Sequence, residues 1–112
     1  MRMIGKLKTP SAGPGAAFHK VMLHETAEGV YAYLYTSPEA LFCACDLCYA
    51  TLTDALEEWN DAVNGWTELE DPLPHCQHDC PLPVRVKGRE SGAPQWGRYE
   101  ILENGEWKDF TP

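Results

Sequence analysis

The fold of this chain depends on one stretch, Thr51-Leu52-Thr53-Asp54-Ala55-Leu56-Glu57-Glu58-Trp59-Asn60-Asp61-Ala62-Val63-Asn64-Gly65. Its apolar side chains recur every three or four positions, which places them on one face of a helix. Thr51 or Thr53 can cap the start, and Asn64-Gly65 accepts the left-handed backbone that ends a helix. The spacing predicts an amphipathic helix over about residues 53–63.

Short segments with strand features lie on both sides of this helix. They alternate in polarity or are rich in aromatic and β-branched residues, and Asn104-Gly105 between two of them is a strong hairpin signal. The expected strands cover residues 17–24, 30–36, 41–48, 84–87, 98–102 and 106–110. Strands before and after one helix predict an α+β fold, mainly an antiparallel sheet with the helix packed on one face.

The chain length predicts the domain organisation. A chain of 112 residues fits one domain. Pro, Gly and Ser concentrate between residues 9 and 16, which is typical of a mobile segment. We therefore expect a flexible N-terminal arm over residues 1–16 and a single domain over residues 17–112.

Negative charge is concentrated in the middle of the chain. The net charge is −8, and residues 21–84 contain twelve acidic residues and no Lys or Arg. A surface this acidic repels phosphate, so nucleic acid is not an expected partner. It suits a basic protein partner, or it serves only as a solvated surface. On the helix, the candidate interaction residues are Asp54, Glu57, Glu58 and Asp61.

Two further side-chain patterns on the expected strands are candidate binding surfaces. Tyr31, Tyr33 and Tyr35 share one face of a strand, where tyrosines form either a binding platform or a half-buried sheet face. Arg85, Lys87 and Arg89 form a cationic run that could bind an anion. Alternatively, such cations protect an edge strand against pairing with another strand.

Cysteine and histidine gather in two clusters, at residues 43–48 and 75–80. Zinc takes four such ligands in a tetrahedral site, and the candidates are Cys45, Cys48, Cys76, His78 and Cys80. An unbroken strand over 41–48 would separate Cys45 from Cys48, because side chains alternate between faces. Buried thiols in the core are the competing interpretation, in which case there is no cofactor.

The remaining features exclude several classes of protein. No apolar run is long enough to span a membrane, and no secretory signal precedes the domain, so the expected location is the cytoplasm. No G-x-S-x-G, P-loop, dinucleotide fingerprint or H-E-x-x-H motif occurs. The sequence therefore favours a non-enzymatic interaction module, such as an inhibitor or immunity-like protein. The alternative is a small zinc-stabilised domain.

Residues 75–79, residues 84–89, Gly92 and residues 94–98 resemble a small family of uncharacterised bacterial proteins. The resemblance extends from about His19 to Trp107. It implies a bacterial cytosolic protein and a stand-alone domain. It implies no activity, cofactor or partner, and it assigns no functional residue.

Overall fold

The computed structural model describes residues 1–13 and 16–112. It divides into two compact units, Met1–Asp71 and Pro72–Pro112, which we call unit 1 and unit 2. The boundary falls inside the expected domain of residues 17–112, at the start of a segment in which Pro72 and Pro74 interrupt regular structure.

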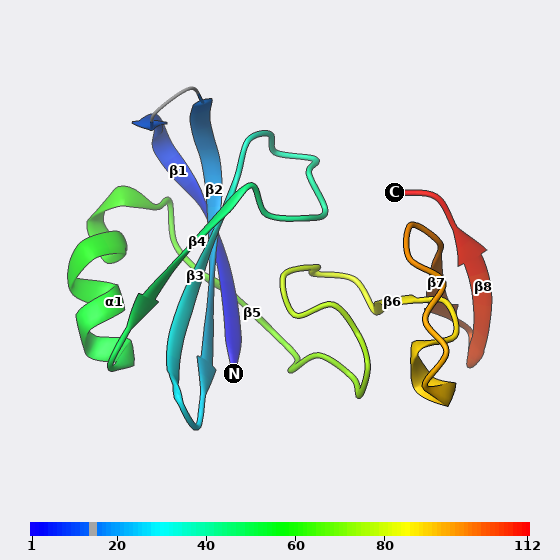
Figure 1. The fold of residues 1–112 in the computed structure, drawn as a ribbon. Coiled ribbons are helices and arrows are strands. Elements are labelled where there is room, and N and C mark those ends of the chain that lie inside the picture. Colours follow the sequence, from blue (N-terminus) through cyan, green and yellow to red (C-terminus); the bar gives the residue numbers. More distant parts are fainter. Residues whose placement is uncertain (14–15) are drawn as a thin grey trace. The chain divides into compact units, whose positions relative to one another are not determined.

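Unit 1 is a five-stranded antiparallel sheet with one helix (Figure 1). The strand order across the sheet is β4-β3-β2-β1-β5. The strands are β1 (Arg2–Gly13), β2 (Ala16–Thr26), β3 (Gly29–Tyr35), β4 (Cys45–Tyr49) and β5 (Thr67–Leu69). Helix α1 (Leu52–Trp59) is continued by one 3-10 turn, η1 (Asn60–Ala62).

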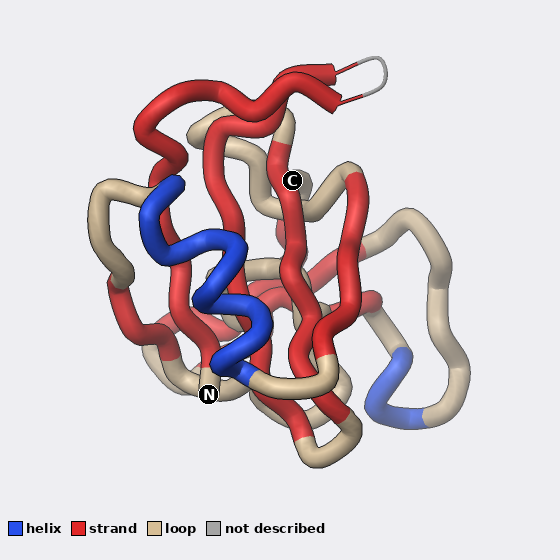
Figure 2. Tube along the Cα trace, turned by 90° about the vertical axis from the view of Figure 1, so that its left-hand side faces the viewer, coloured by secondary structure: helices blue, strands red, loops and turns tan. Residues whose placement is uncertain are grey.

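The helix lies across one face of this sheet (Figure 2), so the predicted α+β arrangement is confirmed. Ala55 and Trp59 of α1 are buried against apolar side chains that alternate along the strands. The strand residues of this core are Leu7, Val21, Leu23, Val30, Ala32 and Leu34. Each fully buried side chain of Val or Leu size contributes roughly 1.5–3 kcal/mol, so this interface holds the helix in place.

The N-terminal segment differs from the expected flexible arm. β1 pairs with β2 and with β5, and Leu7 belongs to the core beneath the helix. The register with β2 shifts between Lys6 and Ser11, so the strand continues through the Pro- and Gly-containing part after an irregularity. Alternating apolar residues at the start of the chain therefore outweigh its loop-like composition. The part of the expected arm at residues 14–15 lies outside the described residues.

The structure differs from the expected strands at two further places. The strand expected over 41–48 begins only at Cys45, because residues 36–44 form a loop that accepts hydrogen bonds from Lys20. Lys20 Nζ donates to the carbonyls of Pro38, at 2.8 Å, and Ala40, at 2.7 Å. β5 is a strand that the sequence does not predict, because three residues give no clear period-two pattern.

Unit 2 is a three-stranded antiparallel sheet in the order β6-β7-β8. Its strands are β6 (Val84–Val86), β7 (Tyr99–Glu103) and β8 (Glu106–Phe110), with a 3-10 turn η2 (Arg89–Ser91) between the first two. Asn104 and Gly105 both have positive φ, 50° and 79°, as the predicted β7–β8 hairpin requires.

Among the described residues, no helix is both long and apolar enough to cross a membrane.

Candidate functional site

The outward side of α1 is acidic. Thr51 is the N-cap, and its Oγ1 accepts a hydrogen bond of 3.2 Å from the backbone N–H of Asp54. With Ala55 and Trp59 turned to the core, the helical period leaves the acidic side chains on the solvent side. Asp54, Glu57, Glu58 and Asp61 are all exposed. The structure thus brings together the four helix residues that the sequence singles out.

A shallow hollow of about 320 Å³ lies on this side of the helix. It is lined by Thr53, Leu56, Glu57, Asn60 and Asp61. Two carboxylates beside one leucine match a lysine or arginine side chain, whose apolar stem packs on hydrocarbon while its charged head meets the carboxylates.

The acids of this helix have no basic partner within the described part of the chain. Asp54, Glu57 and Asp61 form no ion pair there, and Glu58 accepts a hydrogen bond from the hydroxyl of Tyr49. In unit 2, by contrast, four acidic residues lie within ion-pair distance of a cation: Glu90, Glu100, Glu103 and Asp109. The negative charge left uncompensated is therefore concentrated on unit 1.

β4 lies at one edge of the unit 1 sheet and is bound to the helix through Tyr49. The indole N–H of Trp59 donates to the Tyr49 hydroxyl at 2.9 Å, and that hydroxyl donates to Glu58. Burial, and next the hydrogen bond to Glu58, raise the pKa of Tyr49 to about 12. Asp46, Leu47 and Cys48, in the middle of β4, are exposed, and Leu47 is 38% exposed.

The tyrosine stripe is mostly inaccessible. Tyr31, Tyr33 and Tyr35 do share the sheet face opposite the helix, as expected. Tyr33 is 9% exposed and Tyr35 is 0% exposed, and they pack with Met22. The structure therefore favours the half-buried sheet face over the binding platform.

The three cations of the expected anion site lie on different elements, and each already contacts another side chain of unit 2. Arg85 lies on β6, stacks over Trp107 at 3.7 Å, and is 3.3 Å from Glu100. Lys87 is 2.8 Å from Asp109. Arg89 lies in η2 and donates to Gln77 at 3.3 Å. β6 ends at Val86, so the three do not line one strand, and anion binding by them stays a prediction.

The zinc candidates do not form a metal site within residues 1–13 and 16–112. No group of three or more His, Cys, Asp or Glu side chains is placed to hold an ion in that part of the chain. Cys45 pairs with Leu34 and Cys48 with Tyr31, which lie on opposite faces of the sheet. Cys76 and Cys80 are buried and His78 is exposed. Zinc binding stays a prediction.

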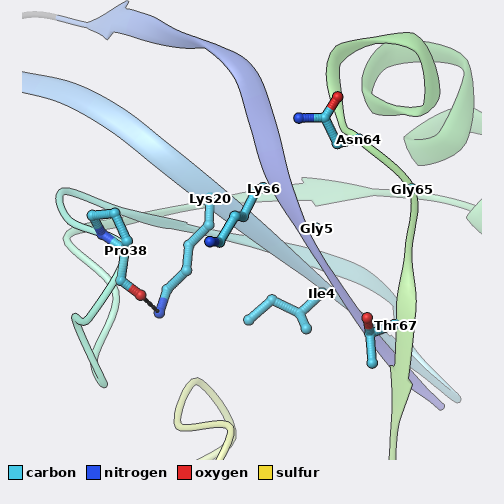
Figure 3. Close-up of a pocket in the computed structure, with 8 residues that line it drawn as sticks. All are labelled: Ile4, Gly5, Lys6, Lys20, Pro38, Asn64, Gly65 and Thr67. Carbon is cyan, nitrogen blue, oxygen red and sulfur yellow. Dashed lines mark hydrogen bonds between the residues drawn. The ribbon is translucent and has the colours of Figure 1, made fainter.

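Sequence reasoning missed a pocket of about 400 Å³ in unit 1 (Figure 3). Lys6 and Lys20 lie opposite each other on β1 and β2 and both line it. Lys20 is buried and held by the Pro38 and Ala40 carbonyls, whereas Lys6 is exposed. The sequence signal for β1, which lines this pocket, is the alternation of side chains over residues 2–7. The Pro-, Gly- and Ser-rich composition of the following segment concealed it.

The sequence also does not single out Trp96 as a candidate site residue. Trp96 is 75% exposed in unit 2. Its loop is ordered by backbone hydrogen bonds, including Gln95 N–H to the Lys87 carbonyl at 2.8 Å and Arg98 N–H to the Gln95 carbonyl at 3.0 Å. Exposed tryptophan is a frequent anchor in protein interfaces, and no sequence pattern separates such a residue from a core tryptophan.

Comparisons with protein-family models, with curated proteins and with solved structures find no match to this chain. The resemblance to a small bacterial family therefore stays a prediction.

Proposed function

We propose that the protein is a non-enzymatic module that binds a basic protein through the acidic side of α1. One observation carries the proposal: the exposed carboxylates of α1 and η1 have no basic partner in the described chain, whereas most acids of unit 2 do. An inhibitor or immunity protein that neutralises a basic partner would be one instance, by analogy only.

The helix bears a free-energy cost for these charges. Asp54 lies three and four residues from Glu57 and Glu58, and like charges at that spacing destabilise a helix by roughly 0.2–0.5 kcal/mol per pair. Asp54 offsets part of this cost, because an acidic side chain in the first turn interacts favourably with the positive end of the helix dipole. Binding of a cationic surface would relieve the remaining repulsion.

The hollow beside Leu56 supports the same type of partner. It is too shallow and open to enclose a small molecule, and its carboxylates, Glu57 and Asp61, favour a cationic head. A net charge of −8 would also accelerate encounter with a basic protein, an effect that salt screens.

The proposal is tested by capture with the full chain from a bacterial lysate at low and high ionic strength. The helix variant carries Asp54→Asn, Glu57→Gln and Asp61→Asn. We expect the wild type to retain a basic protein at low salt, and the helix variant to lose it. Electrostatic association also predicts a steep fall in retention as salt rises.

The matched control removes the same charge elsewhere in unit 1. Glu25→Gln, Glu28→Gln and Glu39→Gln change exposed acids at the end of β2, in the β2–β3 turn and in the loop after β3. This variant should retain the partner. Equal loss by both variants, or retention that is indifferent to salt, would contradict binding through the helix.

A further inference from the structure

Among the sheet edges that the structure describes, β4 has the least protection against pairing with another strand. Proteins shield edge strands by making them very short or by placing charges, especially lysine, along them. β5 and β6 have three residues each, and β8 contains Glu106, Lys108 and Asp109. β4 has five residues, Cys-Asp-Leu-Cys-Tyr, and Asp46 is its only charged side chain.

The backbone of β4 is available on its outer side. β4 is the terminal strand of its sheet and pairs with β3 on one side. In an antiparallel strand, alternate residues direct both N–H and C=O away from the neighbour, so these groups of β4 have no strand partner in the described chain. Exposed Leu47 supplies apolar surface at the centre of the same edge.

We infer that β4 is a docking edge to which an extended, lysine- or arginine-containing segment of a partner protein adds as a further strand. The inference rests on the proposed function and specifies how its basic partner binds. Backbone hydrogen bonds would supply affinity, and side chains of the added strand would supply specificity.

The negative charge around β4 favours a cationic added strand over a second copy of this chain. Asp46 lies on β4 itself, and Glu58 lies at the end of the strand through its hydrogen bond with Tyr49. No Lys or Arg occurs anywhere between residues 21 and 84. A second copy of this chain would bring Asp46 and Glu58 to the same seam, and like charges across strands are destabilising. The charged groups that a cationic strand would meet there are carboxylates, Asp46 on one face of the sheet and Glu58 on the face that carries the helix.

The experiment uses the full chain and three synthetic peptides long enough to cover β4. One alternates lysine and valine. The second has glutamate in place of lysine. The third is the lysine peptide with methyl groups on its backbone nitrogens, which keeps its charge but cannot donate hydrogen bonds. Binding is measured by calorimetry, and amide hydrogen exchange of β4 is measured by NMR.

We expect the lysine peptide to slow exchange of outward-facing amides of β4 and the glutamate peptide not to bind. Losing one or two net hydrogen bonds of about 1 kcal/mol each should weaken binding of the methylated peptide about fivefold to thirtyfold. Asp46→Lys should also weaken binding of the lysine peptide. Glu25→Lys is the matched control, because Glu25 is exposed near the end of β2, which lies inside the sheet, and it should leave binding unchanged.

Three outcomes would overturn the inference. In the first, the methylated peptide binds as tightly as its parent, which means that charge alone drives binding; the proposed function would then still stand. In the second, β4 amides become protected with rising protein concentration and without peptide, which identifies a second copy as the occupant. In the third, the lysine peptide does not slow amide exchange of β4, although the capture experiment retains a basic partner that the helix variant loses. The proposed function would then stand without docking at β4.

Discussion

The indole Nε1 of Trp59 lies 2.9 Å from the phenolic oxygen of Tyr49 and donates a hydrogen bond to it. This contact joins the buried side of α1 to the end of β4, and the Tyr49 hydroxyl passes the connection on to Glu58 at the surface. The acidic helix and the end of β4 are thereby held together.

Because of the Tyr49 hydroxyl, the free energy of unfolding depends on pH in the alkaline range. Its pKa rises from 10.0 to about 12 in the folded chain, so the folded state holds the proton more tightly than the unfolded state. The stabilisation is fully present below pH 10 and is lost as the pH rises toward 12. Tyr49→Phe should remove this part of the loss, which denaturant unfolding of both proteins across that range will measure. If the free energies of unfolding of the two proteins fall in parallel as the pH rises, the Tyr49 hydroxyl does not contribute to the loss.

Gly5 lies where the chain after η1 passes close to β1. A Cβ atom at Gly5 would come within 2.9 Å of the Gly65 carbonyl oxygen and 3.0 Å of the Val63 Cβ. Neither neighbour is a flexible side-chain end, so Gly5→Ala should destabilise the protein by about 1–3 kcal/mol. Thr9→Ala, at an exposed position of the same strand, should stay within about 0.5 kcal/mol of the wild type. Equal free energies of unfolding for the two variants would refute the close approach.

The carboxyl group of Asp109 titrates below its usual range. The hydrogen bond and the charge of Lys87 lower its pKa from 3.8, and Arg98 adds to this effect. A depressed pKa in the folded state means that the pair stabilises the protein above pH 3.8, and that this contribution is lost as the pH falls through the folded pKa. Lys87→Gln should raise the Asp109 pKa toward 3.8, as followed by NMR of the carboxyl carbon. Lys108→Gln should not move it.

The cysteines should differ in reactivity according to their burial. Cys48 is exposed, whereas Cys76 is 2% exposed and Cys80 is 0% exposed. An alkylating reagent should label Cys48 first and the two buried thiols only when the chain unfolds, as peptide mass spectrometry will show. The zinc alternative makes the opposite prediction. Cys48 would be shielded until a chelator is added, and metal analysis would find zinc bound to the protein as purified.

The sequence by itself determined the elements whose signals are local. The helix follows from its apolar period and the Thr51 cap, and the β7–β8 hairpin follows from Asn104-Gly105, because both depend on interactions within a few residues. The acidic surface could also be predicted, since a span without Lys or Arg must carry its charge to the outside.

Only the tertiary structure decided the features that depend on pairing between distant segments. β1 becomes a strand because β2 and β5 satisfy its backbone and the helix covers Leu7, although its composition indicates a mobile arm. Which of Tyr31, Tyr33 and Tyr35 remain accessible depends on what covers their face of the sheet. That β4 is an edge depends on strand order, because five residues look alike in a sequence whether they have one neighbouring strand or two.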